Sequence, residues 1–235
     1  MSGSLAFRAA LAALAFAAAG GVPPAAPAAA AESLKLAPAS LDPKRAYLLV
    51  RLGKRDERVW NLVSFYRYDP EAQDLRGKGR AKANPVPKGE DKAAVVEAKP
   101  FLAEEGNIRT YLVAVTPGRW VIASSPTTSY SLGSYQFDAK AGEITDLGTI
   151  YMGAENGSSI WPRLAGIRSA PDIEKRGYTV ADAMLVEPAG AATPVPAALS
   201  ALPRRPVAYL PARRFGNHSG QMINAVLPLE DAPSP

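Results

Sequence analysis

The sequence predicts a mainly β protein: an antiparallel β-sandwich of about seven strands, followed by a Pro/Ala-rich C-terminal arm that is mostly irregular and carries one or two short helices. Between residues 45 and 153, runs of β-branched and aromatic residues recur, with glycine and proline between them. No part of this stretch has the apolar period of a long helix. Eleven of the 22 prolines fall in residues 160–235, where they disfavour regular structure.

The first 31 residues have the order of a secretory signal peptide. Fifteen of them are alanine, and Arg8 is the one charged side chain. An apolar stretch at 9–19 is followed by a Gly/Pro break and by small residues suited to cleavage near Ala30 or Ala31. The stretch is shorter than the roughly 20 residues that span a bilayer. We expect a cleaved, periplasmic or secreted protein; a disordered leader or an organelle transit peptide is the alternative.

The strands of the predicted sandwich domain, residues 45–153, follow a linker at 32–44. The first strand has a nearly continuous apolar centre, AYLLVRL, and the second alternates, with Trp60, Tyr66 and Tyr68 on one face. A later hairpin turns at Pro117-Gly118, where proline fixes φ and glycine accepts a positive φ. The last hairpin turns around Gly142. The expected strands lie at 46–52, 60–68, 93–98, 109–115, 119–124, 129–137 and 144–152.

Two segments are expected to depart from this pattern. Residues 69–92 are rich in charge, glycine and proline, which favours a long, mobile surface loop. Residues 154–235 form the C-terminal extension, which we expect to pack on the sandwich as an arm rather than as an independent domain. Within it we expect a short helix at 171–176, a helix or strand at 179–186 and one or two helical turns at 196–202. Residues 207–210 and 221–227 are expected to dock on the sandwich as edge strands or packed segments.

The two closing hairpins carry a resemblance to a known family. Their turns read Pro117-Gly118-Arg119-Trp120 and Lys140-Ala141-Gly142-Glu143, followed by Leu147-Gly148-Thr149-Ile150. This pattern resembles the closing strands of transthyretin-like, carboxypeptidase-regulatory-type β-sandwich domains of exported bacterial proteins. The resemblance covers about 40 residues, and the motifs that carry it consist of turn residues. It implies a fold and an envelope setting, and it carries no catalytic residues because such domains are usually accessory modules.

The amino-acid composition excludes several kinds of reactive and metal-binding site. The 235 residues include no cysteine and one histidine, which excludes disulfides, thiol nucleophiles, Cys-ligated zinc and two-histidine metal sites. Cleavage after residue 31 would leave 26 basic and 22 acidic side chains, a net charge of +4 that is modest for a nucleic-acid-binding protein. We expect no cofactor, no metal, no transmembrane segment and no nucleic-acid partner.

Aromatic residues are the candidates for ligand binding: Trp60, Tyr66, Tyr68 and Trp120. An exposed stripe of such rings would suit sugar rings or a protein partner. The same stripe facing inward would be core, and this reading is favoured because the domain has few other large residues.

Three further groups of residues could carry chemistry, but the sequence favours a structural role for each. His218 lies in a glycine-flanked turn beside Ser219, where adjacent side chains point apart and a general-base role is disfavoured. Asp138, Glu143 and Asp146 could bind Ca²⁺, but their spacing fits charged turn residues better. The basic run at 76–82 could touch anionic lipid or polysaccharide, although a solvated loop is favoured.

These observations predict a non-catalytic interaction or structural module of the cell envelope, with an envelope protein or polysaccharide as possible partner. A carbohydrate- or peptidoglycan-binding module that uses exposed aromatics is the first alternative. An enzyme of unrecognised type that uses carboxylates is the second.

Overall fold

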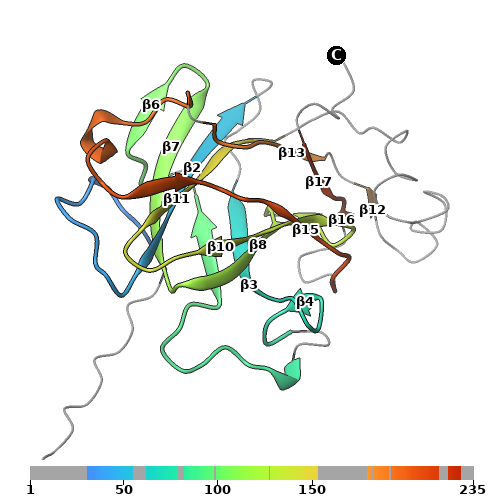
Figure 1. The fold of residues 1–235 in the computed structure, drawn as a ribbon. Coiled ribbons are helices and arrows are strands. Elements are labelled where there is room, and N and C mark those ends of the chain that lie inside the picture. Colours follow the sequence, from blue (N-terminus) through green and yellow to red (C-terminus); the bar gives the residue numbers. More distant parts are fainter. Residues whose placement is uncertain are drawn as a thin grey trace, which may run out of the picture.

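The computed structural model describes residues 31–54, 62–78, 82–97, 99–126, 128–152, 179–180, 183–190, 192–216 and 222–228. These residues form two mixed β-sheets that face each other over a shared core (Figure 1). The mainly β character predicted from the sequence is therefore confirmed. Within these ranges no helix has the length and apolar character needed to cross a membrane. Residues 1–30 of the predicted signal peptide, the predicted helix at 171–176 and His218 lie outside the described residues.

The first sheet, sheet A, is built on three long central strands. β2 (Ala46–Lys54) lies between β7 (Ile108–Val115), with which it pairs antiparallel, and β11 (Ile144–Met152), with which it pairs parallel. Short strands extend the sheet on both sides: β1 (Glu32–Ser33) and β6 (Ala103–Glu105) on β7, β13 (Met184–Glu187) and β14 (Arg204–Pro206) on β11, and β17 (Val226–Pro228) on β13.

The second sheet, sheet B, is centred on β8 (Gly118–Ser124). Its long neighbours are β3 (Val63–Asp69) and β10 (Ser134–Ala139), both antiparallel to it. The remaining strands are short: β4 (Asp74–Leu75) and β5 (Ala93–Val96) on β3, β9 (Thr128–Ser129) on β8, β15 (Leu210–Ala212) on β10, β16 (Met222–Ile223) on β9, and β12 (Thr179–Val180) on β16.

The core between the sheets follows from side-chain alternation. Every second residue of β2 points inward, as Leu48, Val50 and Leu52 do, and meets Phe65 and Ile122 of sheet B. Two smaller clusters cover parts of the outer faces. Sheet A is covered around Tyr47, Leu49, Leu112, Ile144 and Leu199, and sheet B around Tyr68, Leu75, Val121, Ala123, Ala212 and Phe215.

The prediction of purely antiparallel sheets is wrong. β2 and β11 run parallel, and so do β13 and β17. Alternation and turn residues predict strands equally well in both arrangements, because strand direction depends on how distant segments pair. The spans predicted for β2, β5, β7, β8 and β11 agree with the structure to within a few residues.

The C-terminal extension is more regular than its composition predicts. Its described residues contribute strands to both sheets, and the predicted helical turn is the 3₁₀ turn Ala197–Leu199. The segment at 179–186 contains strands, β12 and the start of β13. Prolines are accommodated here because the strands that contain them are short.

The long charged loop at 69–92 is folded where it is described. Leu75 is fully buried, and Asp74 and Asp91 are buried with it. The Asp69 carboxylate organises the turn that follows: Oδ1 accepts hydrogen bonds from the backbone N–H groups of Glu71 at 3.0 Å and Ala72 at 2.9 Å, and Oδ2 accepts one from Asn84 Nδ2 at 2.8 Å. Composition alone predicts a loop here and does not show the buried Leu75 or these hydrogen bonds.

Replacing Asp69 with asparagine is expected to lower the free energy of unfolding by about 1–2 kcal/mol at pH 7. The pKa of Asp69 is lowered by the Ala72 N–H and by the Asn84 and Glu71 donors. A carboxyl whose folded-state pKa is depressed stabilises the fold above its unfolded pKa of about 4 and loses that contribution as the pH falls further. Urea unfolding at pH 7 and pH 3 should show the difference between the proteins shrinking in acid. An equal difference at both pH values would contradict this assignment.

Candidate functional site

The four aromatic candidates do not form one exposed stripe. In the register of β3 with β8, Tyr66 lies opposite Val121 and Arg67 lies opposite Trp120. Because neighbouring residues point to opposite faces, Trp120 projects into the core between the sheets while Tyr66 and Tyr68 project outward.

Burial decides the role of two of these rings. Trp120 is 0 % exposed, and its indole N–H donates to the Thr116 carbonyl at 3.1 Å. Tyr68 is 3 % exposed and packs with Leu75. Neither ring can stack on a sugar, so their prediction as ligand-binding residues is corrected to core. Tyr66 is half-buried beneath the Lys78 ammonium, 5.1 Å from its ring centroid, and Trp60 lies outside the described residues.

The three acidic candidates around the last hairpin are separately paired with arginines. Asp138 contacts Arg119 at 2.6 Å, and Glu143 contacts Arg205 at 3.1 Å. Asp146 is paired with arginines inside the protein. Among the described residues no group of three His, Asp or Glu side chains is placed to hold a metal ion. The hairpin carboxylates therefore have structural partners.

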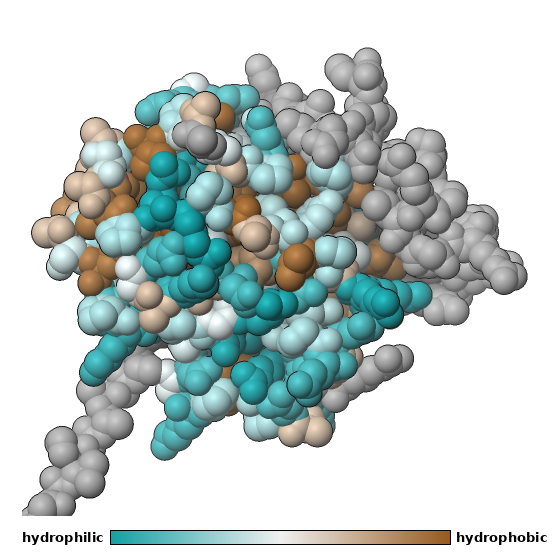
Figure 2. Space-filling view, viewed as in Figure 1, coloured by the Kyte–Doolittle hydropathy of each residue, from teal (hydrophilic) through white to brown (hydrophobic). Residues whose placement is uncertain are grey.

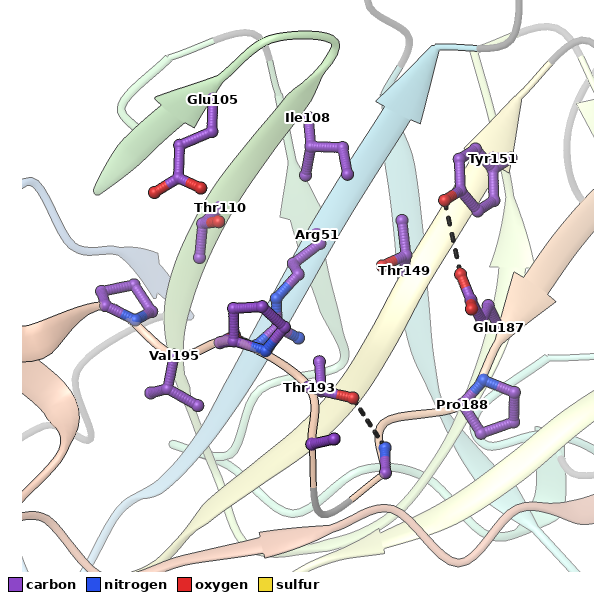
Figure 3. A pocket seen from close by; sticks show the side chains of 14 residues that line it. Arg51, Glu105, Ile108, Thr110, Thr149, Tyr151, Glu187, Pro188, Thr193 and Val195 are labelled. Carbon is purple, nitrogen blue, oxygen red and sulfur yellow. Dashed lines mark hydrogen bonds between the residues drawn. The ribbon is translucent and has the colours of Figure 1, made fainter.

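A cleft of about 600 Å³ lies on the outer face of sheet A, and we call it the outer cleft (Figure 3). Its floor consists of β2, β7 and β11. One wall consists of residues 188–190 and 192–196, which we call the strap. In the space-filling view, hydrophobic residues gather on the upper left of the molecule, whereas the lower part is largely hydrophilic (Figure 2). The outer cleft is lined by Arg51, Glu105, Ile108, Thr110, Thr149, Tyr151, Glu187, Pro188, Gly190, Ala192, Thr193, Pro194, Val195 and Pro196.

Strand register places the floor residues side by side. Arg51 of β2 lies opposite Thr110 of β7 on one side and Thr149 of β11 on the other. The next outward position of β2 is Gly53, which pairs with Tyr151. A Cβ atom on Gly53 would lie 2.5 Å from the Tyr151 ring, so only glycine allows the ring to lie across β2 at the end of the cleft.

The Arg51 guanidinium is held between the sheet and the strap. It donates to both oxygens of the fully buried Asp146, at 2.7 and 3.2 Å, and to the Pro194 carbonyl at 2.6 Å. Arg204 donates to the same carboxylate at 2.9 Å. The bond to Pro194 fixes the strap to the sheet. Arg51 and Arg204 share the one Asp146 carboxylate, so the positive charge of Arg51 is offset in part.

Two glutamates stand at opposite sides of the outer cleft. Glu105 comes from β6, and Glu187 comes from the end of β13; both are exposed. The Tyr151 hydroxyl donates to Glu187 at 3.4 Å, as the dashed line in Figure 3 marks. No cation is paired with either glutamate within the part of the chain that the structure describes. The rim of the cleft is therefore negative, although the whole chain carries a formal charge of +5.

The strap is a stiff wall. Its turn is closed by the Gly190 N–H, which donates to Thr193 Oγ1 at 2.7 Å, and by the Thr193 N–H, which donates to the Gly190 carbonyl at 3.2 Å. Pro188, Pro194 and Pro196 restrict the backbone on either side of this turn. The cleft is thus preformed, with one proline-rich wall and a polar floor.

Sequence reasoning missed the outer cleft. Its walls come from β6, near residue 105, and from the strap, more than 80 positions later. The one local signal is Arg51, a charged residue inside the apolar run of β2. Such a residue requires a buried partner, but the sequence does not say which one.

Tyr209 connects the C-terminal extension to β11 at Leu147, beside Asp146. Its hydroxyl donates to the Leu147 carbonyl at 2.8 Å. Burial, the Asp146 carboxylate and Tyr135 together raise the pKa of Tyr209.

The variant Tyr209→Phe is expected to lose about 1 kcal/mol of unfolding free energy, the usual contribution of one hydrogen bond. The raised pKa of Tyr209 in the folded state means that its contribution to the free energy of unfolding of the parent protein falls as the pH rises above about 10, the pKa in the unfolded state. The Tyr209→Phe variant has no such group and does not show this fall. Urea unfolding at pH 7.5 and pH 10.5 measures both effects. A variant as stable as the parent at pH 7.5 would contradict the structural role of this bond.

Comparison of the chain with protein-family models, with curated proteins and with solved structures finds no match.

Proposed function

We propose that this protein is an exported, non-catalytic binding module of the cell envelope, a β-sandwich that holds its ligand in the outer cleft. The signal-peptide order of residues 1–31 supports export. The likeness of the closing hairpins to transthyretin-like domains supports an accessory role, and it stays a prediction.

The outer cleft is the observation that carries the proposal. Its volume of about 600 Å³ lies in the range of small-molecule sites, which are usually preformed and combine apolar walls with a few polar groups. Here the walls include Ile108, Val195 and the strap prolines, and the polar groups are hydroxyls and carboxylates. A rigid sheet floor presents them without prior rearrangement.

Binding is favoured over catalysis by the placement of the charged groups. Between Glu105 and Glu187 the strands run in the order β6, β7, β2, β11 and β13. Four strand spacings separate their backbones by about 19 Å. A pair of carboxylates that acts on a glycosidic bond needs a separation of about 5–10 Å. The two glutamates are thus arranged to hold opposite ends of a ligand.

Export is tested by expressing the full chain in a Gram-negative host and measuring the intact mass of the protein in each cell fraction. The proposal expects a periplasmic or secreted protein that begins at Ala31 or Glu32. A protein of full-length mass that stays in the cytoplasm would overturn the envelope setting.

Binding through the cleft is tested with the variant Thr149→Trp, which fills the floor with a side chain that strands tolerate. Val95→Trp is the matched control, because Val95 is an exposed residue of β5 on sheet B. The immobilised proteins are incubated with solubilised envelope extract, and the retained molecules are compared by mass spectrometry. A component retained by the parent and by Val95→Trp, and lost with Thr149→Trp, supports the function. Equal retention by all three would remove the outer cleft from it.

A further inference from the structure

We propose that the outer cleft takes an alkylammonium chain: one or two primary ammonium groups on a methylene stem, as in a polyamine or a lysine side chain. This inference rests on the proposed binding function and names its ligand class. The charge of the rim, the hydroxyls of the floor and the apolar walls together point to this chemistry.

The rim supplies the charge. Glu105 and Glu187 are the carboxylates of the cleft, and the one cation in its lining, Arg51, is bound to Asp146. A cationic ligand therefore meets two carboxylates without displacing an existing ion pair. The Tyr151 hydroxyl lies beside Glu187 and adds a hydrogen-bonding group at that end (Figure 3).

The floor supplies two threonine hydroxyls. Thr110 is 8 % exposed and Thr149 is 6 % exposed, and both line the cleft. Neither hydroxyl has a hydrogen-bond partner within the described ranges. Figure 3 shows both side chains on the cleft floor, on either side of Arg51. Among the described residues, neither hydroxyl oxygen belongs to the fully buried side-chain atoms that lack a partner, so both are open to the cleft, where a ligand can hydrogen-bond to them in place of water.

The walls suit methylene groups. Ile108 on one side and Val195, Pro194 and Pro196 of the strap offer apolar contact between the charged ends. The span of about 19 Å between the backbones of the two glutamates shortens when their side chains lean inward, and an extended polyamine can then reach both. A single lysine side chain would engage one end only.

The experiment is a calorimetric titration of the mature protein at low salt with two probes. Spermidine represents a free polyamine, and a short capped peptide with two lysines represents a protein partner. Both should bind if the cleft recognises a primary ammonium group on a methylene stem. The probe that binds more tightly shows whether the natural ligand is a free polyamine or a lysine side chain of a protein. Fully N-acetylated spermidine, which has the same stem but no primary ammonium, should bind at least about tenfold more weakly. If neither amine binds at millimolar concentration, the inference is overturned.

Variants locate the site. Glu105→Gln and Glu187→Gln should each weaken binding of the better probe by about threefold to tenfold, and Thr149→Val by about fivefold. Glu104→Gln is the matched control, since it removes the same charge from the adjacent residue, whose carboxylate is paired with Arg109 at 3.0 Å. If Glu104→Gln and Glu105→Gln weaken binding of the probe equally, the probe is attracted by the overall negative charge and not by Glu105, and the proposed site is wrong. If both amines fail while cleft-dependent capture from envelope extract persists, only the ligand class is wrong and the binding function stands.

Discussion

Replacing Asp146 with asparagine is expected to lower the free energy of unfolding by about 3–5 kcal/mol. The Asp146 side chain is completely buried and accepts hydrogen bonds from Arg51 at 2.7 and 3.2 Å and from Arg204 at 2.9 Å. Asparagine keeps the shape but removes the charge, which leaves the buried Arg51 guanidinium without its counter-ion. Removing one partner of a buried pair costs much more than the pair itself contributes.

The matched control for this prediction is Asp138→Asn. Asp138 binds Arg119 in a two-point contact of 2.6 and 2.7 Å, but its side chain is 49 % exposed. Water solvates both charges when this pair is broken, so the expected loss is below about 1 kcal/mol. Urea unfolding followed by circular dichroism compares the two variants at neutral pH. Equal losses of unfolding free energy would show that burial of Asp146 does not increase the cost of breaking its ion pairs.

The Asp146 cluster shows what the sequence does and does not predict. An arginine within AYLLVRL indicates that β2 carries a charged residue in a buried setting. The partner, Asp146, is 95 positions away and reaches Arg51 because β11 pairs parallel with β2. Strand formation is encoded locally by alternation and turn residues, whereas pairing between distant strands depends on the packing of the whole chain.

The aromatic residues illustrate the same limit. Alternation correctly separates Phe65 from Tyr66 and Tyr68 on β3. Whether Trp120 shares a face with Tyr66 depends on the register between β3 and β8, which includes an irregularity near Ser64. A shift of one residue in register reverses which side chains lie together, and the sequence of either strand alone does not fix it.

The C-terminal extension was the least predictable part of the fold. Its strands are two to four residues long, too short for a period to be recognised. β13, β14, β15 and β16 pair with strands of the predicted sandwich domain, whereas β12 pairs with β16 and β17 pairs with β13. The outer cleft depends on this extension for its strap and for Glu187, which explains why sequence reasoning did not find it.

The second large effect is expected for Gly148→Ala, which should lose about 2–5 kcal/mol of unfolding free energy. Gly148 has φ = +79° and lies in the irregularity of β11, where its N–H donates to Asp146 Oδ1 at 3.1 Å. An added Cβ would clash with the Glu187 carbonyl oxygen and would lie 2.5 Å from the Ala189 nitrogen. Both are backbone atoms, which no side-chain rotation can move away.

Gly106→Ala separates the cost of the positive φ from the cost of the steric clash. Gly106 also has a positive φ, +57°, but an added Cβ would meet nothing within 4 Å. Its expected loss is about 1 kcal/mol, from backbone conformation alone. The difference between the two variants in urea unfolding measures the close approach of the strap to β11.

Gly148→Ala should also affect binding, because the same contact positions Glu187 at the rim of the outer cleft. If the variant still folds, its affinity for the better amine probe should fall by about threefold or more, as expected for Glu187→Gln. A variant that loses stability but keeps full affinity would show that the position of the strap does not determine ligand binding. The packing of Gly148 against the strap thus couples the stability of sheet A to the geometry of the cleft.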